Sequence, residues 1–349
     1  MKTEAAILFQ TGAELRVEEI EIPEHLSSGQ VLVRVITSGI CGAQINEIDA
    51  VKGPDQFLPH LLGHEGYCEV LRISEDVTTV AVGDLAIMHW RPSQGIQSST
   101  PKYLWNGKVV NAGWVTTFNR HSVVSENRLT KIDSQGFSRE ILPLLGCALT
   151  TSFGVITKEA GVKSEDKVII FGAGGVGLSM LKILKSIQVE DVCVVDVSEE
   201  KIELARRFGA AHIVRFENKN QVADEIRAYF ASGLPNVAFD TTGKVPCIEL
   251  AYEQSDPQGL ALLVGVPKFG EKSSIYTLPL HFGKRLIGSK GGGSIPNIDI
   301  PILMEKMKTG RLDFSDFPTR VYSLSDINSA LNDLRSGRVG RMVIDMEIN

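Results

Sequence analysis

The sequence predicts an α/β protein in which a parallel-sheet domain interrupts a β-rich domain. From about residue 149 to 288, apolar runs alternate with helical runs, whereas short strand-like runs dominate before residue 145. That alternation is typical of a parallel sheet with helices on both faces, because a helix must carry the chain back before each new strand. The length of 349 residues suggests about two domains at roughly 150 residues each.

The flanking regions supply the β-rich domain. Strand-like runs rich in Val, Ile and Leu occur at 30–40, 67–73 and 84–90, and Gly, Pro or Ser bounds them. After about residue 290 come helical runs at 300–310 and 325–337 and a closing strand at 341–346. We therefore assign 1–148 and 289–349 to the β-rich domain.

The inserted domain is predicted to span 149–288. Its strand-like runs lie at 167–173, 192–197, 237–243 and 260–266. The helical runs between them lie at 175–187, 198–210 and 245–254.

Charge and cysteine content exclude several classes of protein. The 36 basic and 42 acidic residues give a net charge of −6, so we expect neither nucleic acid nor a membrane surface as a partner. No apolar run approaches the ~18 residues of a spanning helix, and the first residues do not form a signal peptide. Five cysteines without a secretory signal predict a reduced, cytoplasmic protein.

A glycine-rich turn joins the first strand of the inserted domain to its first helix. Gly172, Gly174 and Gly177 have the spacing that permits a tight turn, close approach of a pyrophosphate, and close helix–strand packing. Asp196 ends the next strand, where a carboxylate accepts hydrogen bonds from the adenosine ribose and selects NAD over NADP. The alternative is a structural turn with an aspartate that caps the following helix.

Four possible metal ligands lie in three separate segments of the β-rich domain. Cys41, His64, Glu65 and Cys147 share no local spacing such as CxxC or HExxH. A single cysteine is more often a small core residue, and a single histidine a satisfied polar group. Spacing alone therefore leaves a metal site open.

Taken together, the motifs resemble the zinc-dependent alcohol and polyol dehydrogenases of the medium-chain dehydrogenase/reductase superfamily, over essentially the whole chain. This resemblance implies a GroES-like catalytic domain and a Rossmann domain. It implies a catalytic zinc on Cys41, His64 and Cys147, with Glu65 as an alternating or outer ligand. The motifs that carry it are SGICG (38–42), GHEG (63–66), GDLAIMHW (83–90), LGCALTTSFGV (145–155), FGAGGVGLS (171–179), VVDVSEEKIELARRFGA (194–210), FDTTG (239–243), LLVGVP (262–267) and SGRVGRMVIDM (336–346).

The resemblance also assigns residues to the cofactor and the substrate. Arg341 would reach the pyrophosphate of NAD; the alternative is a solvated arginine at a strand end. The other NAD-binding residues would be Thr151, Gly172, Gly174, Gly175, Val176, Gly177, Asp196, Lys201, Val264 and Val266. The substrate pocket would include Ala43, Trp90, Phe118, Asn119 and Lys290.

The expected reaction follows from that site. Zinc lowers the pKa of an alcohol, and the alkoxide releases a hydride to the nicotinamide. Polar residues near Trp90, namely His89, Arg91, Asn119 and Lys290, predict a polyhydroxylated substrate such as a sugar, cyclitol or nucleotide sugar. The alternative is a small apolar pocket surrounded by polar loops.

Several positions depart from the family pattern. No cysteine lies between Met88 and Arg120, so we expect no structural zinc. Ala43 and Asn46 replace the residues that usually pass the alcohol proton outward, which leaves water, a substrate hydroxyl, Glu47 or His89 for that role. Gln44 replaces the carboxylate that often accepts a hydrogen bond from the zinc-bound histidine.

Two other functions stay open. The first is a zinc-free reductase of the same superfamily that acts on quinones or activated double bonds. The second is a nucleotide-binding protein without catalysis. The resemblance further implies a homodimer or homotetramer, with 284–292 as the candidate sheet edge.

Overall fold

Both ends of the chain belong to one unit of the structure. The computed structural model describes residues 1–338 and 340–348, so Val339 of the last motif lies outside the described residues. Unit 1 comprises Met1–Thr150, Ile295–Thr309 and Phe314–Asn349, and unit 2 comprises Thr151–Ser294 and Gly310–Asp313. The sequence placed these boundaries after residues 148 and 288.

Two short segments pack differently from the prediction. Residues 289–294 and 310–313, assigned from sequence to the β-rich domain, pack with unit 2. A Cβ atom at Gly154 would lie 2.2 Å from the carbonyl oxygen of Gly292, so the two backbones touch there. The Lys182 ammonium donates to the carbonyl of Asp313 over 2.9 Å.

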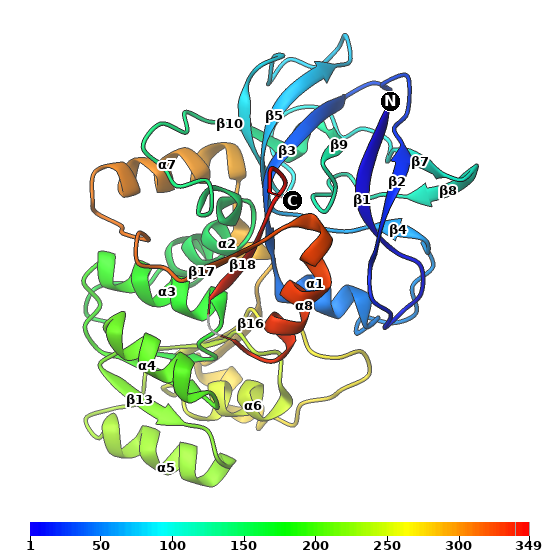
Figure 1. The fold of residues 1–349 in the computed structure, drawn as a ribbon. Coiled ribbons are helices and arrows are strands. Elements are labelled where there is room, and N and C mark those ends of the chain that lie inside the picture. Colours follow the sequence, from blue (N-terminus) through cyan, green and yellow to red (C-terminus); the bar gives the residue numbers. More distant parts are fainter. Residues whose placement is uncertain (339, 349) are drawn as a thin grey trace. The chain divides into compact units, whose positions relative to one another are not determined.

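Unit 1 is built on two sheets. The larger has the order β10-β6-β5-β3-β18-β17, with β9 also paired to β3, and the smaller is a closed barrel in the order β1-β2-β7-β8-β4. The C-terminal strand β18 lies antiparallel beside the N-terminal β3, red beside blue in Figure 1. The strands are β1 (Lys2–Leu8), β2 (Arg16–Glu21), β3 (Gln30–Ile40), β4 (His60–Leu61), β5 (Gly66–Ile73), β6 (Leu85–Met88), β7 (Lys102–Trp105), β8 (Lys108–Asn111), β9 (His121–Ser125), β10 (Leu129–Lys131), β17 (Thr319–Tyr322) and β18 (Arg341–Asp345).

Alternation along β3 explains the core of unit 1. Val31, Val33 and Val35 point into one apolar cluster, because successive side chains of a strand face opposite sides. Ile327, Ala330 and Leu331 of α8 add one face of that helix to the same cluster. The helices of unit 1 are α1 (Gly42–Ile48), α7 (Pro296–Lys308) and α8 (Ile327–Arg335), with short turns η1 (Glu126–Arg128), η2 (Leu142–Gly146) and η6 (Leu324–Asp326). Helix α2 (Ala148–Gly154) crosses the boundary between the units.

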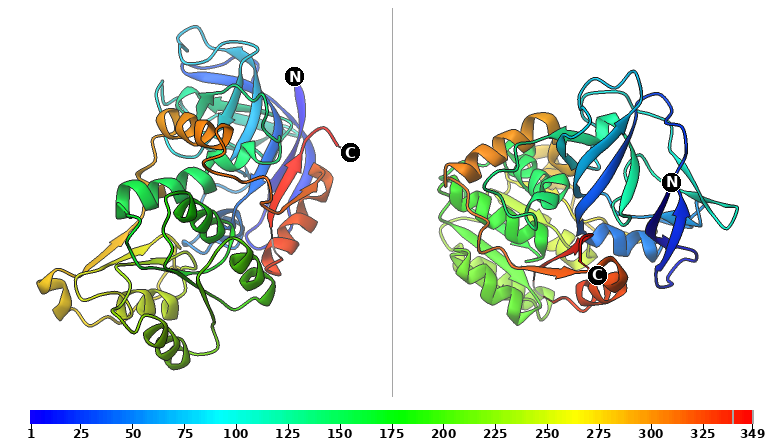
Figure 2. Two further views of the ribbon diagram at one scale, coloured as in Figure 1. Left: turned by 90° about the vertical axis from the view of Figure 1, so that its left-hand side faces the viewer. Right: turned by 45° about the horizontal axis from the view of Figure 1, so that its top comes forward.

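Unit 2 contains a six-stranded parallel sheet in the order β13-β12-β11-β14-β15-β16. This is the doubly wound order, in which the chain first builds outward on one side of β11 and then on the other. Side chains of α5 and α6 join one apolar cluster with side chains of β11, β12 and β14. Helices α3 and α4 contact each other (Figure 2). The strands are β11 (Val168–Phe171), β12 (Val192–Asp196), β13 (His212–Arg215), β14 (Val237–Asp240), β15 (Leu260–Leu263) and β16 (Arg285–Gly288). The helices are α3 (Gly175–Ser186), α4 (Glu199–Arg207), α5 (Lys219–Tyr229) and α6 (Val245–Glu253), with turns η3 (Val155–Ala160), η4 (Leu278–Phe282) and η5 (Gly291–Gly293).

The predicted fold class is confirmed. A β-rich domain of the GroES-like type and a parallel-sheet domain of the Rossmann type are both present. The sequence analysis missed β13 and α5, because His212–Arg215 is short and only partly buried. No helix within the described residues combines the length and the apolarity that crossing a membrane requires.

Candidate functional site

Three of the predicted ligands meet in unit 1. One ligand atom each from Cys41, His64 and Cys147 lies within 4.8 Å of the other two. Cys41 follows β3, His64 precedes β5, and Cys147 follows η2. In the alcohol dehydrogenase type of site, catalytic zinc is bound by two cysteine sulfurs and one histidine nitrogen. Its fourth coordination position is left for the substrate. The donor set therefore fits zinc.

Backbone pairing brings these distant segments together. The amide of Gly39 donates to the carbonyl of Glu65 over 3.0 Å, which ties the end of β3 to the loop that carries His64. A Cβ atom at Gly146 would lie 2.2 Å from the carbonyl oxygen of Met88, so only glycine lets the Cys147 segment approach so closely.

The two cysteines of the cluster ionise at different pH. Hydrogen bonding with Cys147, together with the charges of His64 and Arg341, lowers the pKa of Cys41 well below that of an ordinary thiol, although burial opposes the shift. The same shared proton raises the pKa of Cys147. The proton shared by the two thiols is therefore held more tightly by Cys147 than by Cys41, and metal binding would displace it.

Glu65 lies outside the three-ligand cluster. Its carboxylate is fully buried, accepts a hydrogen bond from the Arg341 guanidinium, and accepts a second from the Ala148 amide over 3.4 Å. Burial raises the pKa of Glu65 to about 6 despite the arginine. Direct metal ligation by Glu65 stays a prediction.

Arg341 is buried rather than solvated, with 5% of its surface exposed. The alternative of a solvated strand-end arginine is therefore wrong. Its guanidinium pairs with Glu65, while its buried Nε has no hydrogen-bond partner among the described residues. A contact between Arg341 and a pyrophosphate stays a prediction.

The side chain of Gln44 forms a hydrogen bond with the ring of His64. The amide nitrogen of Gln44 lies 2.5 Å from Nδ1 of His64, and its amide oxygen accepts from the Cys41 amide over 3.4 Å. In this orientation Nδ1 accepts a hydrogen bond, so the ring proton sits on the other nitrogen. If a metal bound that other nitrogen, Nδ1 would carry the ring proton and would donate a hydrogen bond to Gln44. A 180° rotation of the Gln44 amide would turn its oxygen toward Nδ1 to accept that bond.

We expect Gln44→Ala to weaken zinc binding by about 10- to 100-fold, because His64 loses the partner that fixes its ring. Competition with a chelator measures the affinity. Asn46→Ala, on the same helix, is the control and should bind zinc as the wild type does. Equal zinc affinity in both variants would exclude the supporting role of Gln44.

His89 is not suited to carry a proton. It is fully buried; Nδ1 donates to the Arg91 carbonyl over 2.8 Å, and Nε2 lies 2.9 Å from the Thr130 hydroxyl. Burial lowers the pKa of His89 to about 4, so the ring stays neutral near pH 7. Glu47 remains a candidate for proton transfer, since the residue is exposed overall while burial around its carboxyl group raises its pKa.

His89 gives a testable pH dependence of stability. Its pKa is about 4 when folded but near ~6.5 in the unfolded chain, so unfolding takes up a proton between these values. Stability from the neutral ring is present above that range and is lost as pH falls through it. Between pH 6.5 and 5 the free energy of unfolding should drop by about 1.5 kcal/mol more in the wild type than in His89→Gln.

Urea titrations at each pH provide that comparison. The exposed His25 gives the matched control, since His25→Gln should keep the wild-type dependence. A His89→Gln protein with the wild-type dependence would contradict the assignment.

The predicted substrate residues have different environments. Ala43 and Trp90 are half-buried in unit 1, whereas Lys290 is exposed in unit 2. Phe118 is fully buried in the core cluster, and Asn119 is fully buried with its amide donating to the His121 carbonyl. The last two thus belong to the interior of unit 1, and their contact with a substrate stays a prediction.

The glycine-rich turn in unit 2 has three distinct environments. Gly172 has a φ of +98°, a conformation that other residues rarely adopt. A Cβ atom at Gly177 would lie 1.9 Å from the Gly172 carbonyl oxygen, whereas one at Gly174 would meet no atom within 4 Å. Gly177 is therefore packed tightly against the Gly172 backbone, whereas no atom occupies the space beside Gly174. Gly175 and Val176 begin α3 behind it.

Asp196 fixes the turn to the next strand. One carboxylate oxygen accepts from the Ala173 amide over 2.6 Å, and the other accepts from the Ser198 amide over 2.9 Å. The capping role weighed from sequence is not seen, because Ser198 is the N-cap of α4 and Asp196 bonds to the Ser198 amide rather than to an amide of the helix. Since an ionised carboxylate has about four lone-pair sites, two remain for ribose hydroxyl groups.

The other predicted NAD-binding residues also lie in unit 2. The Ser152 hydroxyl donates to the Val176 carbonyl over 3.2 Å and ties the Thr151 segment to α3. Val264 donates its amide to the Asp240 carbonyl over 2.7 Å. Val266 is exposed and Lys201 is half-buried.

Thr241 is a structural residue that the sequence analysis did not single out. Its hydroxyl donates to the carbonyls of Phe171 and Gly172 over 2.9 and 3.0 Å, between β11 and β14. The sheet order reverses between these strands, and ligands of doubly wound folds bind there. The FDTTG motif was the available signal.

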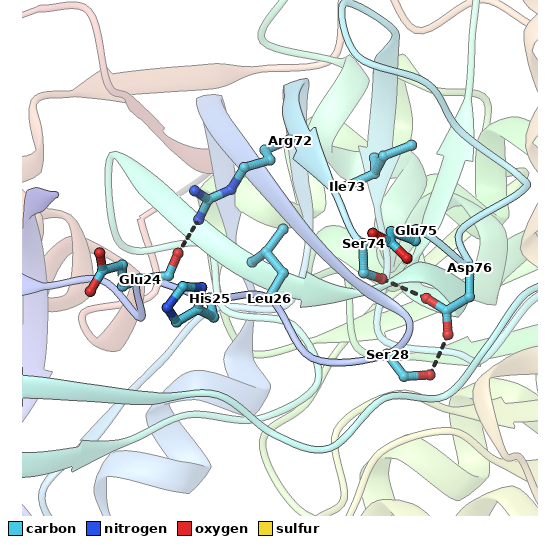
Figure 3. A pocket seen from close by; sticks show the side chains of 9 residues that line it. All are labelled: Glu24, His25, Leu26, Ser28, Arg72, Ile73, Ser74, Glu75 and Asp76. Carbon is cyan, nitrogen blue, oxygen red and sulfur yellow. Dashed lines mark hydrogen bonds between the residues drawn. The ribbon is translucent and has the colours of Figure 1, made fainter.

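A separate hollow of about 540 Å³ lies elsewhere in unit 1 and contains none of the predicted site residues. Two of its charged side chains bond to neighbours in the lining: Asp76 accepts from Ser28 and Ser74, and Arg72 donates to the Glu24 carbonyl (Figure 3). This hollow is therefore separate from the cluster of metal ligands.

Two family models match this chain, each over a different part of the sequence. Residues 27–134 match the family model of the alcohol dehydrogenase GroES-like domain, and residues 175–309 match that of zinc-binding dehydrogenase. The S-(hydroxymethyl)glutathione dehydrogenases of Synechocystis sp. and of Escherichia coli O1:K1 are 27% and 28% identical, over 99% of this chain and 100% of their own lengths.

Solved structures agree on the fold. Benzyl alcohol dehydrogenase from Acinetobacter calcoaceticus superposes with a TM-score of 0.87 at 24% identity over 99% of each chain. The alcohol dehydrogenase from Aeropyrum pernix superposes with a TM-score of 0.79 at 23% identity, over 98% of this chain and 99% of its own.

Proposed function

Because this chain belongs to the zinc-dependent, alcohol dehydrogenase-like part of the medium-chain dehydrogenase/reductase superfamily, we propose that it transfers a hydride between an alcohol or ketone and NAD. The observation that carries the proposal is the convergence of Cys41, His64 and Cys147 within 4.8 Å. A zinc-free reductase would have no need of that set.

Unit 1 would hold the metal and prepare it for an alcohol. Zinc, when bound, acts as a Lewis acid that lowers the pKa of an alcohol. The Cys41 and Cys147 thiolates balance the charge of the ion, so that a neutral carbonyl product leaves readily. The pairing of Glu65 with Arg341 adds no net charge beside the thiolates.

Unit 2 would hold the dinucleotide. NAD, when bound, supplies the nicotinamide that exchanges the hydride. Gly175 and Val176 begin α3, and the amides at this end of the helix would present their positive end to a pyrophosphate. Asp196 would accept hydrogen bonds from the adenosine ribose and repel a 2′-phosphate, which favours NAD over NADP.

Metal analysis and NADH formation test the proposal together. We expect about one zinc per chain, because no second set of cysteines is present for a structural ion. NAD reduction with an alcohol should stop when the zinc is removed and return when it is restored. A zinc-free protein that oxidises NADH with quinones would favour the superfamily reductase instead, and NADH binding without turnover would favour a non-catalytic role.

We propose a polyhydroxylated substrate on the polar residues around Trp90. His89 and Asn119 are engaged inside the fold, so Arg91 is the polar candidate for substrate contact in unit 1. Lys290, which is exposed in unit 2, stays a prediction. Cyclitols and sugars should be compared with ethanol, benzyl alcohol and S-(hydroxymethyl)glutathione, the last two taken from the names of related proteins. A clear preference for ethanol-sized alcohols would sink this part of the proposal.

We propose a homodimer or homotetramer formed through β16, the last strand in the order of the unit 2 sheet. Exposed apolar side chains occur in β16 and in the segment before it, namely Ile287 at 37%, Phe282 at 71% and Tyr276 at 68% exposure. A sheet edge with such side chains favours pairing with a second copy. Ile287→Lys should shift the mass from light scattering toward the monomer. A wild-type monomer at micromolar concentration would contradict the assembly.

A further inference from the structure

Asp55 and His60 form a buried, hydrogen-bonded pair in unit 1. Nε2 of His60 lies 2.7 Å from a carboxylate oxygen of Asp55, and Nδ1 lies 3.0 Å from the carbonyl oxygen of Leu61. The side chains of His60 and Asp55 are 8% and 10% exposed. Because both ring nitrogens face oxygen atoms, both hydrogen bonds form only when the pair holds one proton more than a neutral imidazole beside a carboxylate. The geometry therefore favours a positively charged His60 ring beside an ionised Asp55.

The loop that carries this pair is anchored to the barrel of unit 1. The second carboxylate oxygen of Asp55 accepts a hydrogen bond from the Phe57 amide over 2.8 Å. Asn111 of β8 donates its side-chain amide to the Phe57 carbonyl over 2.7 Å and its backbone amide to the Pro59 carbonyl over 2.9 Å. His60 itself lies in β4, which pairs with β1 and with β8. These bonds fix the position of the pair.

Glu47 lies within electrostatic reach of both His60 and the metal ligand His64. Burial around its carboxyl group raises the pKa of Glu47, whereas the positive charges of His60 and then of His64 lower it. Charges much more than about 10 Å apart would be screened by salt, so the carboxyl group is near both rings. The helix explains this position. Glu47 follows Gln44 by three residues in α1, which makes them neighbours on its surface, and Gln44 contacts the His64 ring.

Other charged groups near Glu47 have less effect or are already paired. Asp55 raises the pKa of Glu47 and Lys52 lowers it, each with less effect than the two histidines. On α8, which contacts α1, the Arg335 guanidinium forms an ion pair over 2.7 Å with the aspartate at the end of α1. His60 is therefore the charge that most favours the ionised form of this carboxyl group.

The expected reaction needs a group that accepts a proton. Oxidation of an alcohol to a carbonyl compound releases one proton for each hydride that is transferred. Ala43 and Asn46, which stand where the alcohol proton usually passes outward, have side chains that do not ionise. Glu47 is exposed overall, so a proton on its carboxyl group can leave to solvent.

We infer that Glu47 is the base that receives the proton of the alcohol, and that the Asp55–His60 pair holds Glu47 in its ionised form. This inference rests on the proposed function and deepens it, because it gives the proton a path. The O–H bond of the alcohol breaks, and its proton passes through water to a carboxylate oxygen of Glu47, where a new O–H bond forms. The accompanying hydride goes to NAD, and Glu47 then loses the proton to solvent. His60 is a positioning residue, since its charge stabilises the carboxylate that must be present at the start of each cycle.

The pH dependence of alcohol oxidation by the zinc-loaded protein tests the inference. Glu47→Gln should lower kcat by about 100-fold or more, because a positioned base typically contributes that much. Glu47→Asp keeps a carboxyl group and should recover part of the loss. His60→Gln removes the charge that holds Glu47 ionised, so kcat should fall about tenfold at pH 6 but less than about twofold at pH 9. A merely structural role of His60 would lower kcat equally at both pH values.

Carbon-13 NMR of the glutamate carboxyl groups gives a second readout, which needs no turnover. The Glu47 resonance is identified by its absence in Glu47→Gln. In His60→Gln the pKa of Glu47 should be higher than in the wild type, because the charge that opposes burial is gone. His60→Asn serves the same purpose if His60→Gln does not fold. The matched control is His121→Gln, since His121 is a half-buried histidine of unit 1 that bonds to Thr3, and its removal should leave the pKa of Glu47 unchanged.

The outcomes separate the two proposals. A His60→Gln protein with the wild-type pH profile and an unchanged pKa of Glu47 would show that the pair does not act on Glu47. Wild-type kcat in Glu47→Gln would exclude Glu47 as the base, even though alcohols are oxidised. If the wild type turns over no alcohol with NAD, the proposed function fails, and the NMR comparison still decides whether the Asp55–His60 pair holds Glu47 ionised.

Discussion

Replacing Cys147 with serine is expected to remove the bound zinc and to lower kcat/KM for alcohol oxidation by at least about 10³-fold. Serine keeps the size of the side chain, but its hydroxyl stays protonated near neutral pH and is a poor zinc ligand. Losing the metal removes several kcal/mol of charge stabilisation, and each ~1.36 kcal/mol is tenfold in rate. Metal analysis after dialysis and initial rates of NADH formation measure the two effects.

The matched control for this variant is Cys68→Ala. Cys68 is a fully buried thiol in the core of unit 1, bonded to the Ala86 carbonyl and outside the metal cluster. It should keep about one zinc per chain. A Cys147→Ser protein that retains zinc as well as the wild type does would show that Cys147 is not a ligand.

Replacing Gly177 with alanine is expected to destabilise unit 2 by about 3 kcal/mol, near the upper end for overpacking. The added methyl group would lie 1.9 Å from the Gly172 carbonyl oxygen, which is backbone and cannot move aside like a flexible side chain. The helix must therefore shift away from the turn. Urea unfolding without NAD measures the change in free energy.

Gly174→Ala separates folding from cofactor binding at the same turn. No atom lies within 4 Å of the new methyl group, and the φ of −77° suits alanine, so stability should change by less than about 0.5 kcal/mol. NADH affinity should fall about tenfold or more, because the methyl group occupies the space where a pyrophosphate would approach. Unchanged NADH affinity in Gly174→Ala would contradict a nucleotide at this turn.

The sequence predicted the features that depend on near neighbours along the chain. Strand β3 was expected at 30–40 and lies at Gln30–Ile40, since a run rich in Val, Ile and Leu between turn residues is a local signal. The glycine-rich turn was equally local, because its strand, turn and helix follow one another within about 20 residues. The ligand set Cys41, His64 and Cys147, in contrast, came from the resemblance to a family, because no local spacing links the three residues.

Long-range contacts were not predictable in the same way. The partner of Glu65 is Arg341, 276 residues away, and it depends on the pairing of β18 with β3. His89 and Asn119 were predicted as polar contacts for a substrate, with surface loops as the alternative, yet both are fully buried.

By itself, the sequence determined the two kinds of domain, the nucleotide-type turn and the residue types available for a metal. Only the tertiary structure decided which of those residues share one site, which polar groups are buried, and which charges pair with each other. The physical reason is that backbone preferences and apolar periodicity act over a few residues. Burial and charge pairing, in contrast, depend on the register of strands that lie far apart in the chain.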